Sequence, residues 1–68
     1  MDTQKIEKDN RTRFLEVYSN LPINLREEII LVLEKRGPIS WNVAYLEIKN
    51  NTELGESILK KLEELGII

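Results

Sequence analysis

The sequence contains neither cysteine nor histidine. Without cysteine, the chain can form no disulfide framework and no thiolate metal site. Histidine is the most common general base and the most common zinc ligand, so both roles lose their usual residue. The three glycines stand apart in the sequence and form no phosphate-binding loop. We therefore expect a protein that is not an enzyme, with no metal ion, no cofactor and no evident small-molecule substrate.

The chain also lacks a strong charge of one sign and any long apolar run. Ten basic and twelve acidic residues leave a net charge of −2, which counts against strong phosphate contact unless a local basic patch outweighs the mean. No apolar stretch approaches the roughly 18 residues of a membrane-spanning helix. The N-terminal residues show no apolar core of a secretory signal. We expect a cytoplasmic protein that does not associate with membranes.

What the sequence does contain is a regular apolar pattern in a chain of 68 residues, which predicts one domain over residues 1–68. A chain of this length buries only about 60% of its unfolded surface, so its stability is marginal. Good helix packing or self-association must therefore add to that stability.

The pattern predicts four helices, of which the first covers Thr3–Ser19 and ends before Pro22. A second helix is predicted from Asn24, which has Glu27 at the spacing of a capping box. Its predicted end is Gly37, the usual residue after a helix C-terminus.

Ser40 is the predicted cap of a third helix, Trp41–Lys49. The polar turn Asn50–Thr52 leads into the fourth helix, Glu53–Leu65, which Gly66 ends. The expected fold class is therefore all-α. It is a four-helix small domain in which residues 1–20 form the N-terminal helix and residues 24–68 a helix-turn-helix-like trihelical core.

Two stretches carry a resemblance to a known family, LREEIILVLEKRGPIS at residues 25–40 and SILKKLEELGII at residues 57–68. The first is similar to the opening helix and helix-turn-helix entry of winged-helix transcription regulators. The second is similar to the end of their recognition helix and the start of the strand that leads to the wing. The resemblance covers about residues 25–68, and the chain ends where the family continues into its wing.

The resemblance implies that Trp41–Lys49 is a positioning helix and that Glu53–Leu65 enters the major groove of DNA. The base-facing positions it implies are Glu53, Glu56, Ser57 and Lys60. The positions it implies to face phosphates are Lys49, Asn50, Asn51, Thr52 and Lys61. From the residues themselves, a local basic patch for phosphates is expected from Arg11, Arg13 and Arg26.

Several apolar residues lie off the main faces of the predicted helices, namely Leu31, Val43 and Leu46. The N-terminal helix could cover them within one chain, or they could form an interface with a second copy or another protein. The single tryptophan, Trp41, is either a core anchor or a partner-binding residue.

Two functions are consistent with these observations. The first is a small DNA-binding transcriptional regulator of the helix-turn-helix type that acts on duplex DNA as a homodimer. The alternative is a protein-interaction or assembly module that uses a wingless winged-helix scaffold without binding DNA. The acidic recognition face and the off-face apolar residues favour the alternative.

Overall fold

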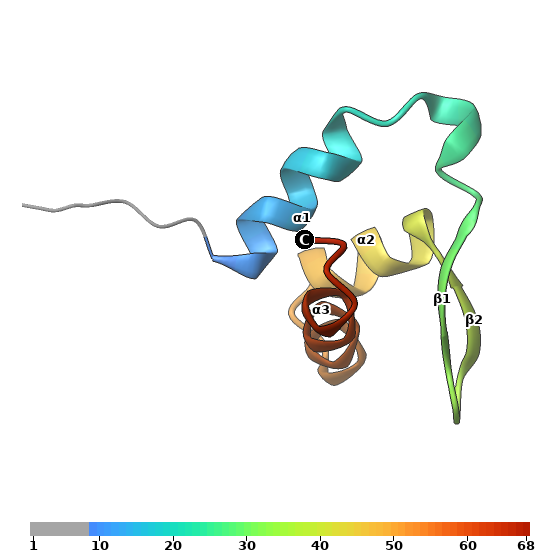
Figure 1. Ribbon diagram of the computed structural model, residues 1–68, viewed down its shortest axis with the longest axis vertical. Helices are drawn as coiled ribbons and strands as arrows, with labels where there is room; N and C mark the ends of the chain where they lie inside the picture. The colour runs from blue at the N-terminus through green and yellow to red at the C-terminus, as the bar shows by residue number, and fades with distance from the viewer. Residues whose placement is uncertain (1–8) are drawn as a thin grey trace, which may run out of the picture.

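Three helices and one β-hairpin make up residues 9–68, which are the residues that the computed structural model describes. The predicted helical residues 3–8 lie outside this range. The elements in chain order are helix α1 (Asn10–Ser19), the 3₁₀ turn η1 (Ile23–Leu25), strands β1 (Ile29–Leu33) and β2 (Gly37–Ser40), and helices α2 (Trp41–Lys49) and α3 (Glu53–Glu64). Figure 1 shows the hairpin running along one side of the helices, with its turn at the end away from η1. The fold is α+β, and the all-α prediction is wrong.

Helix α1 lies between the N-cap residue Asp9 and the C-cap residue Asn20. The carboxylate of Asp9 accepts a hydrogen bond from the Thr12 backbone N–H at 2.8 Å, which satisfies one of the free donors of the first turn. The helix ends at Ser19, and Pro22 follows after a short bend. The predicted end of the first helix is confirmed.

The predicted second helix does not form, and the 3₁₀ turn η1 and strand β1 take its place. Residues 29–33 read IILVL, and a helix would spread such a run around its whole circumference. As a strand, the run buries Leu31, which is 6% exposed, and turns Val32 outward at 63% exposed. Asn24 lies inside η1, which has no side-chain cap, so the predicted capping box with Glu27 is also absent.

A glycine at the turn makes the hairpin possible. The Leu33 carbonyl accepts a hydrogen bond from the Arg36 N–H at 3.2 Å, and Gly37 follows with φ of 82°. The hydrogen bond closes a four-residue turn from Leu33 to Arg36, and the glycine after the turn adopts a left-handed conformation. Gly37 therefore has the positive φ expected of a residue after a helix, but in a different structural setting.

The two strands pair antiparallel, with one irregularity in their register. Leu31 lies opposite Ile39, Val32 opposite Pro38 and Leu33 opposite Gly37. The register shifts between Ile29 and Leu31, so Ile30 is the extra residue of a bulge.

The last two helices confirm the sequence prediction closely. The Ser40 hydroxyl accepts a hydrogen bond from the Val43 N–H at 3.1 Å and begins α2. The Thr52 hydroxyl accepts one from the Gly55 N–H at 2.9 Å and begins α3, which ends at Glu64, one residue earlier than predicted. A Cβ at Gly55 would collide with the backbone of Glu47, so this glycine lets α2 and α3 approach closely.

The core lies where the three helices and the inner face of the hairpin meet. Its buried apolar residues are Phe14, Leu31, Ile39, Ala44, Ile48, Ile58 and Leu62. Trp41 packs against Phe14 with ring centroids 5.7 Å apart, so the tryptophan joins the hairpin end of α2 to α1. The predicted N-terminal helix thus covers the core, although only its residues from Asn10 onward are described.

Candidate interaction surfaces

The exposed side of α3, which the family resemblance assigns to DNA bases, carries charges of both signs with an acidic excess. Its basic side chains are Lys60 and Lys61, and Ser57 is exposed beside them. The acidic side chains on the same helix are Glu53, Glu56, Glu63 and Glu64. Lys61 lies 4.0 Å from Glu64, which partly neutralises it. These carboxylates repel phosphates, so α3 alone is a poor groove reader.

The turn between α2 and α3 is largely occupied by contacts within the fold. The Thr52 hydroxyl donates to the Glu47 side chain and also caps α3, so it is not free for a phosphate. Asn51 has φ of 58°, a conformation that asparagine tolerates better than most residues. Asn50 and Asn51 are exposed, and they are the two turn residues whose side chains remain available to a ligand.

The predicted basic patch is divided between two ends of α1. Arg11 donates to the Lys49 carbonyl at 3.0 Å, where it complements the negative end of the α2 dipole. Arg26 lies 4.5 Å over the ring of Tyr18, at the opposite end of α1. Arg13 is exposed between them. The three arginines therefore do not converge on one point.

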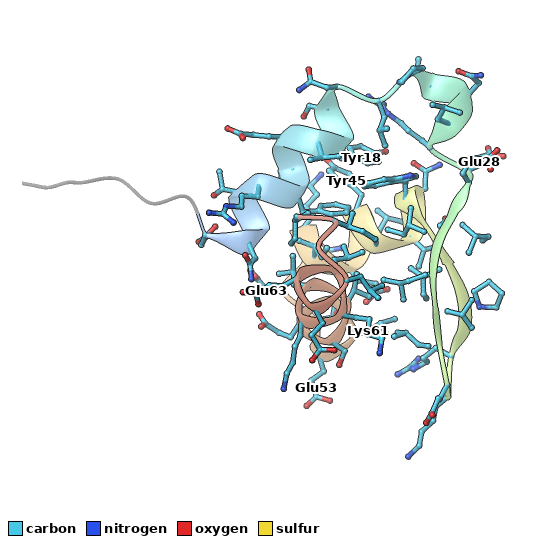
Figure 2. All side chains as sticks on the ribbon, viewed as in Figure 1. Tyr18, Glu28, Tyr45, Glu53, Lys61 and Glu63 are labelled. Carbon is cyan, nitrogen blue, oxygen red and sulfur yellow. The ribbon has the colours of Figure 1, made fainter. Side chains whose placement is uncertain are left out.

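Two stacked tyrosines lie at the contact between α1 and α2, with Arg26 over one ring and Lys49 over the other. Tyr18 and Tyr45 stack with ring centroids 4.3 Å apart and planes 8° apart. Both side chains are labelled in Figure 2. Lys49 Nζ lies 5.5 Å from the Tyr45 ring, and the Tyr18 hydroxyl donates to Asn42 Oδ1 at 2.7 Å. The arrangement fixes α1 against α2, and it explains why the tyrosines are only partly exposed.

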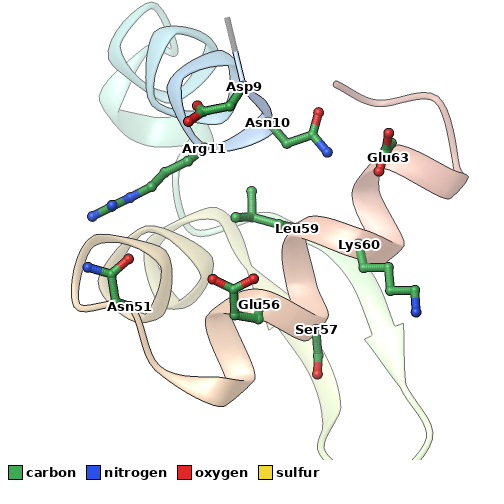
Figure 3. Close-up of a pocket in the computed structure, with 9 residues that line it drawn as sticks. All are labelled: Asp9, Asn10, Arg11, Asn51, Glu56, Ser57, Leu59, Lys60 and Glu63. Carbon is green, nitrogen blue, oxygen red and sulfur yellow. The ribbon is translucent and has the colours of Figure 1, made fainter.

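A hollow of about 580 Å³ lies between the start of α1 and the exposed side of α3. Figure 3 shows Asp9, Asn10 and Arg11 on one side of it and Glu56, Lys60 and Glu63 on the other. The Thr12 backbone N–H is the main reason that the pKa of Asp9 lies below its usual value, so this carboxylate is charged at neutral pH. The hollow is open, and its charges are mixed.

Of the four predicted interface residues, two are exposed on α2. Leu46 is 55% exposed, and Val43 lies one helical turn before it, also exposed. Trp41 is half-buried against Phe14. Leu31 was expected outside the main face of a helix that does not form, and it is a core residue of β1.

Sequence reasoning missed the exposed apolar residues around the hairpin. Ile23 is 79% exposed in η1, and Ile29 is 55% exposed at the start of β1. Val32 faces outward with Pro38 beside it on β2. Treating residues 29–33 as a strand bounded by polar residues would have indicated that both of its faces are apolar.

Two shallow grooves separate the hairpin from α3, with volumes of about 430 and 340 Å³. The first lies between Val32–Glu34 and the middle of α3, and its rim includes Lys60 and Lys61. The second lies between the hairpin turn, with Lys35 and Arg36, and the start of α3. The hairpin turn thus adds cations beside the acidic helix.

These surfaces belong to a small α+β domain with a helix–hairpin–helix–helix order. Within residues 9–68, no group of three acidic side chains is placed to hold a metal ion. None of the helices in that range is both long and apolar enough to cross a bilayer. No known protein family, curated protein or solved structure matches the chain.

Proposed function

We propose that this protein is an assembly module that associates with itself through the apolar surface of the hairpin and of the outer side of α2. The observation that carries the proposal is the exposure of large apolar side chains on these two elements, which are joined at Ser40. They are Ile29, Val32, Val43 and Leu46, with Ile23 and Leu25 in the preceding turn. Large apolar side chains that a small domain leaves exposed on adjoining elements are candidates for an interaction surface.

Burial of these apolar side chains in a contact favours association. Covering one half-exposed isoleucine or leucine contributes on the order of 1 kcal/mol. Several such side chains are needed to offset the lost translational and rotational freedom of two molecules, and the hairpin and α2 provide several. A domain of this size also gains core when a second copy covers its surface.

Sedimentation equilibrium across protein concentration tests the proposal. The double variant Val43→Lys with Leu46→Lys should weaken self-association by about tenfold or more, because it places two charges in an apolar contact. The matched control is Thr12→Lys with Ser19→Lys, two exposed polar positions on α1, and it should associate like the parent chain. A parent protein that sediments as a monomer at every concentration would contradict the proposal.

A second candidate function is binding of duplex DNA, and one specific observation favours it. The hairpin turn brings Lys35 and Arg36 beside the start of α3, while Lys60 and Lys61 lie on the α3 side of the neighbouring groove. Helix α3 follows the tight α2–α3 turn and lies beside the hairpin. In this candidate function α3 faces a groove of the DNA, and the cations of the hairpin turn and of α3 contact phosphates.

Fluorescence anisotropy with labelled duplex DNA over a range of salt concentrations tests this candidate. The variant Lys35→Gln with Arg36→Gln should lower affinity and reduce the slope of log affinity against log salt by roughly two. The control Lys35→Arg with Arg36→Lys keeps both charges, so its affinity and its salt slope should stay close to those of the parent chain. Absence of salt-dependent binding at low ionic strength rules the candidate out.

A further inference from the structure

The two edges of the hairpin differ in what they offer to another strand. Pro38 has no N–H, and a proline is accommodated in an antiparallel pair when its nitrogen points away from the partner strand. Since Pro38 lies opposite Val32, its nitrogen faces the outer edge of β2. That edge therefore lacks a donor at its centre and is a poor template for a further strand.

The same register makes the edge of β1 a good template. Residues that lie opposite each other in an antiparallel ladder either exchange both hydrogen bonds or point both sets of groups away. Because Pro38 cannot exchange them, Val32 points its own N–H and C=O to the outer edge of β1. Val32 is also the outward side chain of the strand, at 63% exposed. Val32 also lines the open groove between β1 and the middle of α3, so a strand that pairs with this edge lies beside Lys60 and Lys61 of α3.

Charge at the two ends of β1 indicates which neighbour fits. Glu27 and Glu28 precede the strand and are exposed, and Figure 2 shows Glu28 at the end of the hairpin nearest η1. Glu34, Lys35 and Arg36 follow the strand, so the turn end has an excess of positive charge. Between the two ends, the five residues of β1 carry no charge.

We propose that the partner in self-association is a second copy whose β1 pairs antiparallel with the first β1, about a twofold axis at Val32. The inference rests on the proposed assembly function and specifies its geometry. An antiparallel pair of identical strands places the acidic start of each β1 beside the basic turn of the other. The strand residues next to the axis then pair with each other, and beyond the paired strands Glu28 comes near the turn residues Lys35 and Arg36 of the second copy. The two hairpins become one four-stranded sheet.

The pairing also completes an apolar strip on the outer face. Val32 and Pro38 of one copy continue across the axis to the same two residues of the other copy. Side chains opposite each other across antiparallel strands stabilise a sheet, and β-branched pairs do so well. A twofold contact of this kind closes on itself, so it yields a dimer and leaves β2, with its proline, as the outer edge on both sides.

The first test changes the backbone of the free edge. Val32→Pro removes one donor per copy that faces the second strand but none that faces β2, so dimer affinity should fall roughly tenfold or more. Val32→Thr keeps the N–H and a β-branched side chain, and it should retain affinity within a few-fold. Circular dichroism confirms that each variant is folded. Equal dimer affinity in the folded Val32→Pro variant and the parent overturns the β1 pairing.

The second test uses charge and remains decisive if Val32→Pro does not fold. Glu28→Arg and Arg36→Glu should each weaken the dimer about two- to fivefold at low salt, because each variant brings like charges near each other twice. The double variant should recover affinity to within about twofold of the parent. Additive losses in the double variant overturn the pairing.

The two proposals fail differently. A chain that is monomeric at every concentration overturns both the assembly function and the β1 pairing. A dimer that is weakened by Val43→Lys with Leu46→Lys, but not by the changes at Val32, Glu28 and Arg36, overturns the pairing and leaves the assembly function standing.

Discussion

The helix pair α2–α3 and the β-hairpin contain similar apolar residues, but they bury different shares of them. In the helix pair, Ile48, Ile58 and Leu62 are almost completely buried, and Gly55 allows the two backbones to touch. In the hairpin, Leu31 and Ile39 face the core while Ile29 and Val32 face solvent.

The difference has a geometric cause. A helix collects its apolar residues on one stripe, so a single neighbour covers them. A strand divides a continuous apolar run between two faces, and here only one face has a neighbour. The hairpin therefore buries one side in the core and leaves the other exposed, whereas α2 and α3 bury their main apolar stripes and only Val43 and Leu46 of α2 lie outside that contact.

The strongest test of this comparison is truncation of one large side chain in each region. Ile58→Ala should cost about 2–5 kcal/mol of unfolding free energy, because this α3 side chain is fully buried. Such a loss approaches the whole stability of a domain this small. Val32→Ala should change it by about 0.5 kcal/mol or less in a dilute, dissociated sample. Urea unfolding measures both, and a similar loss in the two variants would contradict the division.

The contact between α2 and α3 gives the next largest effect. Gly55→Ala should cost about 2 kcal/mol, since the added carbon meets the Glu47 backbone and the helices must separate. Alanine favours a helix more than glycine does, which offsets about 1 kcal/mol of the repulsion. Thermal unfolding measures the net loss. A variant more stable than the parent would show that the helices separate easily.

The hairpin turn should respond to strain alone. Gly37→Ala meets no atom within 4 Å but must adopt φ of 82°, so we expect a loss of about 1 kcal/mol. Gly37→Asn, which tolerates that conformation better, is the control and should lose less. Chemical denaturation of the two variants gives the difference. Loss of equal size in both would point to a cause other than backbone conformation.

The smallest effect distinguishes the caps of α1 and α2 by pH. The pKa of Asp9 is lowered chiefly by the Thr12 N–H, so its contribution to stability is present above the unfolded pKa and declines as pH falls through the lower folded value. In the Asp9→Ala variant, the free energy of unfolding should therefore fall less steeply as the pH is lowered into the acidic range. Ser40→Ala should lower stability by about 1 kcal/mol at every pH. An NMR titration of Asp9 that shows an ordinary pKa would remove the expected difference.

Local signals were sufficient for some elements and not for others. Ser40 and Thr52 cap the helices that follow them, and Gly66 has φ of 76° after α3, all as the sequence predicts. The same kind of signal was misleading at Asn24 and Gly37, because a capping residue and a left-handed glycine suit a turn as well as a helix end. Five consecutive apolar residues at 29–33 fit either structure, and periodicity could not choose between them.

The candidate surfaces were predicted to a similar extent. Val43 and Leu46 are exposed on α2. Their positions off the main face of the predicted helix had made them candidates for an interface. Ile29 and Val32 were missed, since their exposure depends on the strand that the sequence did not reveal.

By itself, the sequence determined the lack of cysteine and histidine chemistry, the mixed charge, and the starts of α2 and α3. Those properties depend on single residues and their near neighbours, through charge, hydrogen bonding and backbone preference. Only the tertiary structure decided that residues 29–40 form a hairpin and which of its sides is covered. That choice depends on whether the inner side finds Phe14, Ile48 and the rest of the core, and these contacts join residues far apart in the chain.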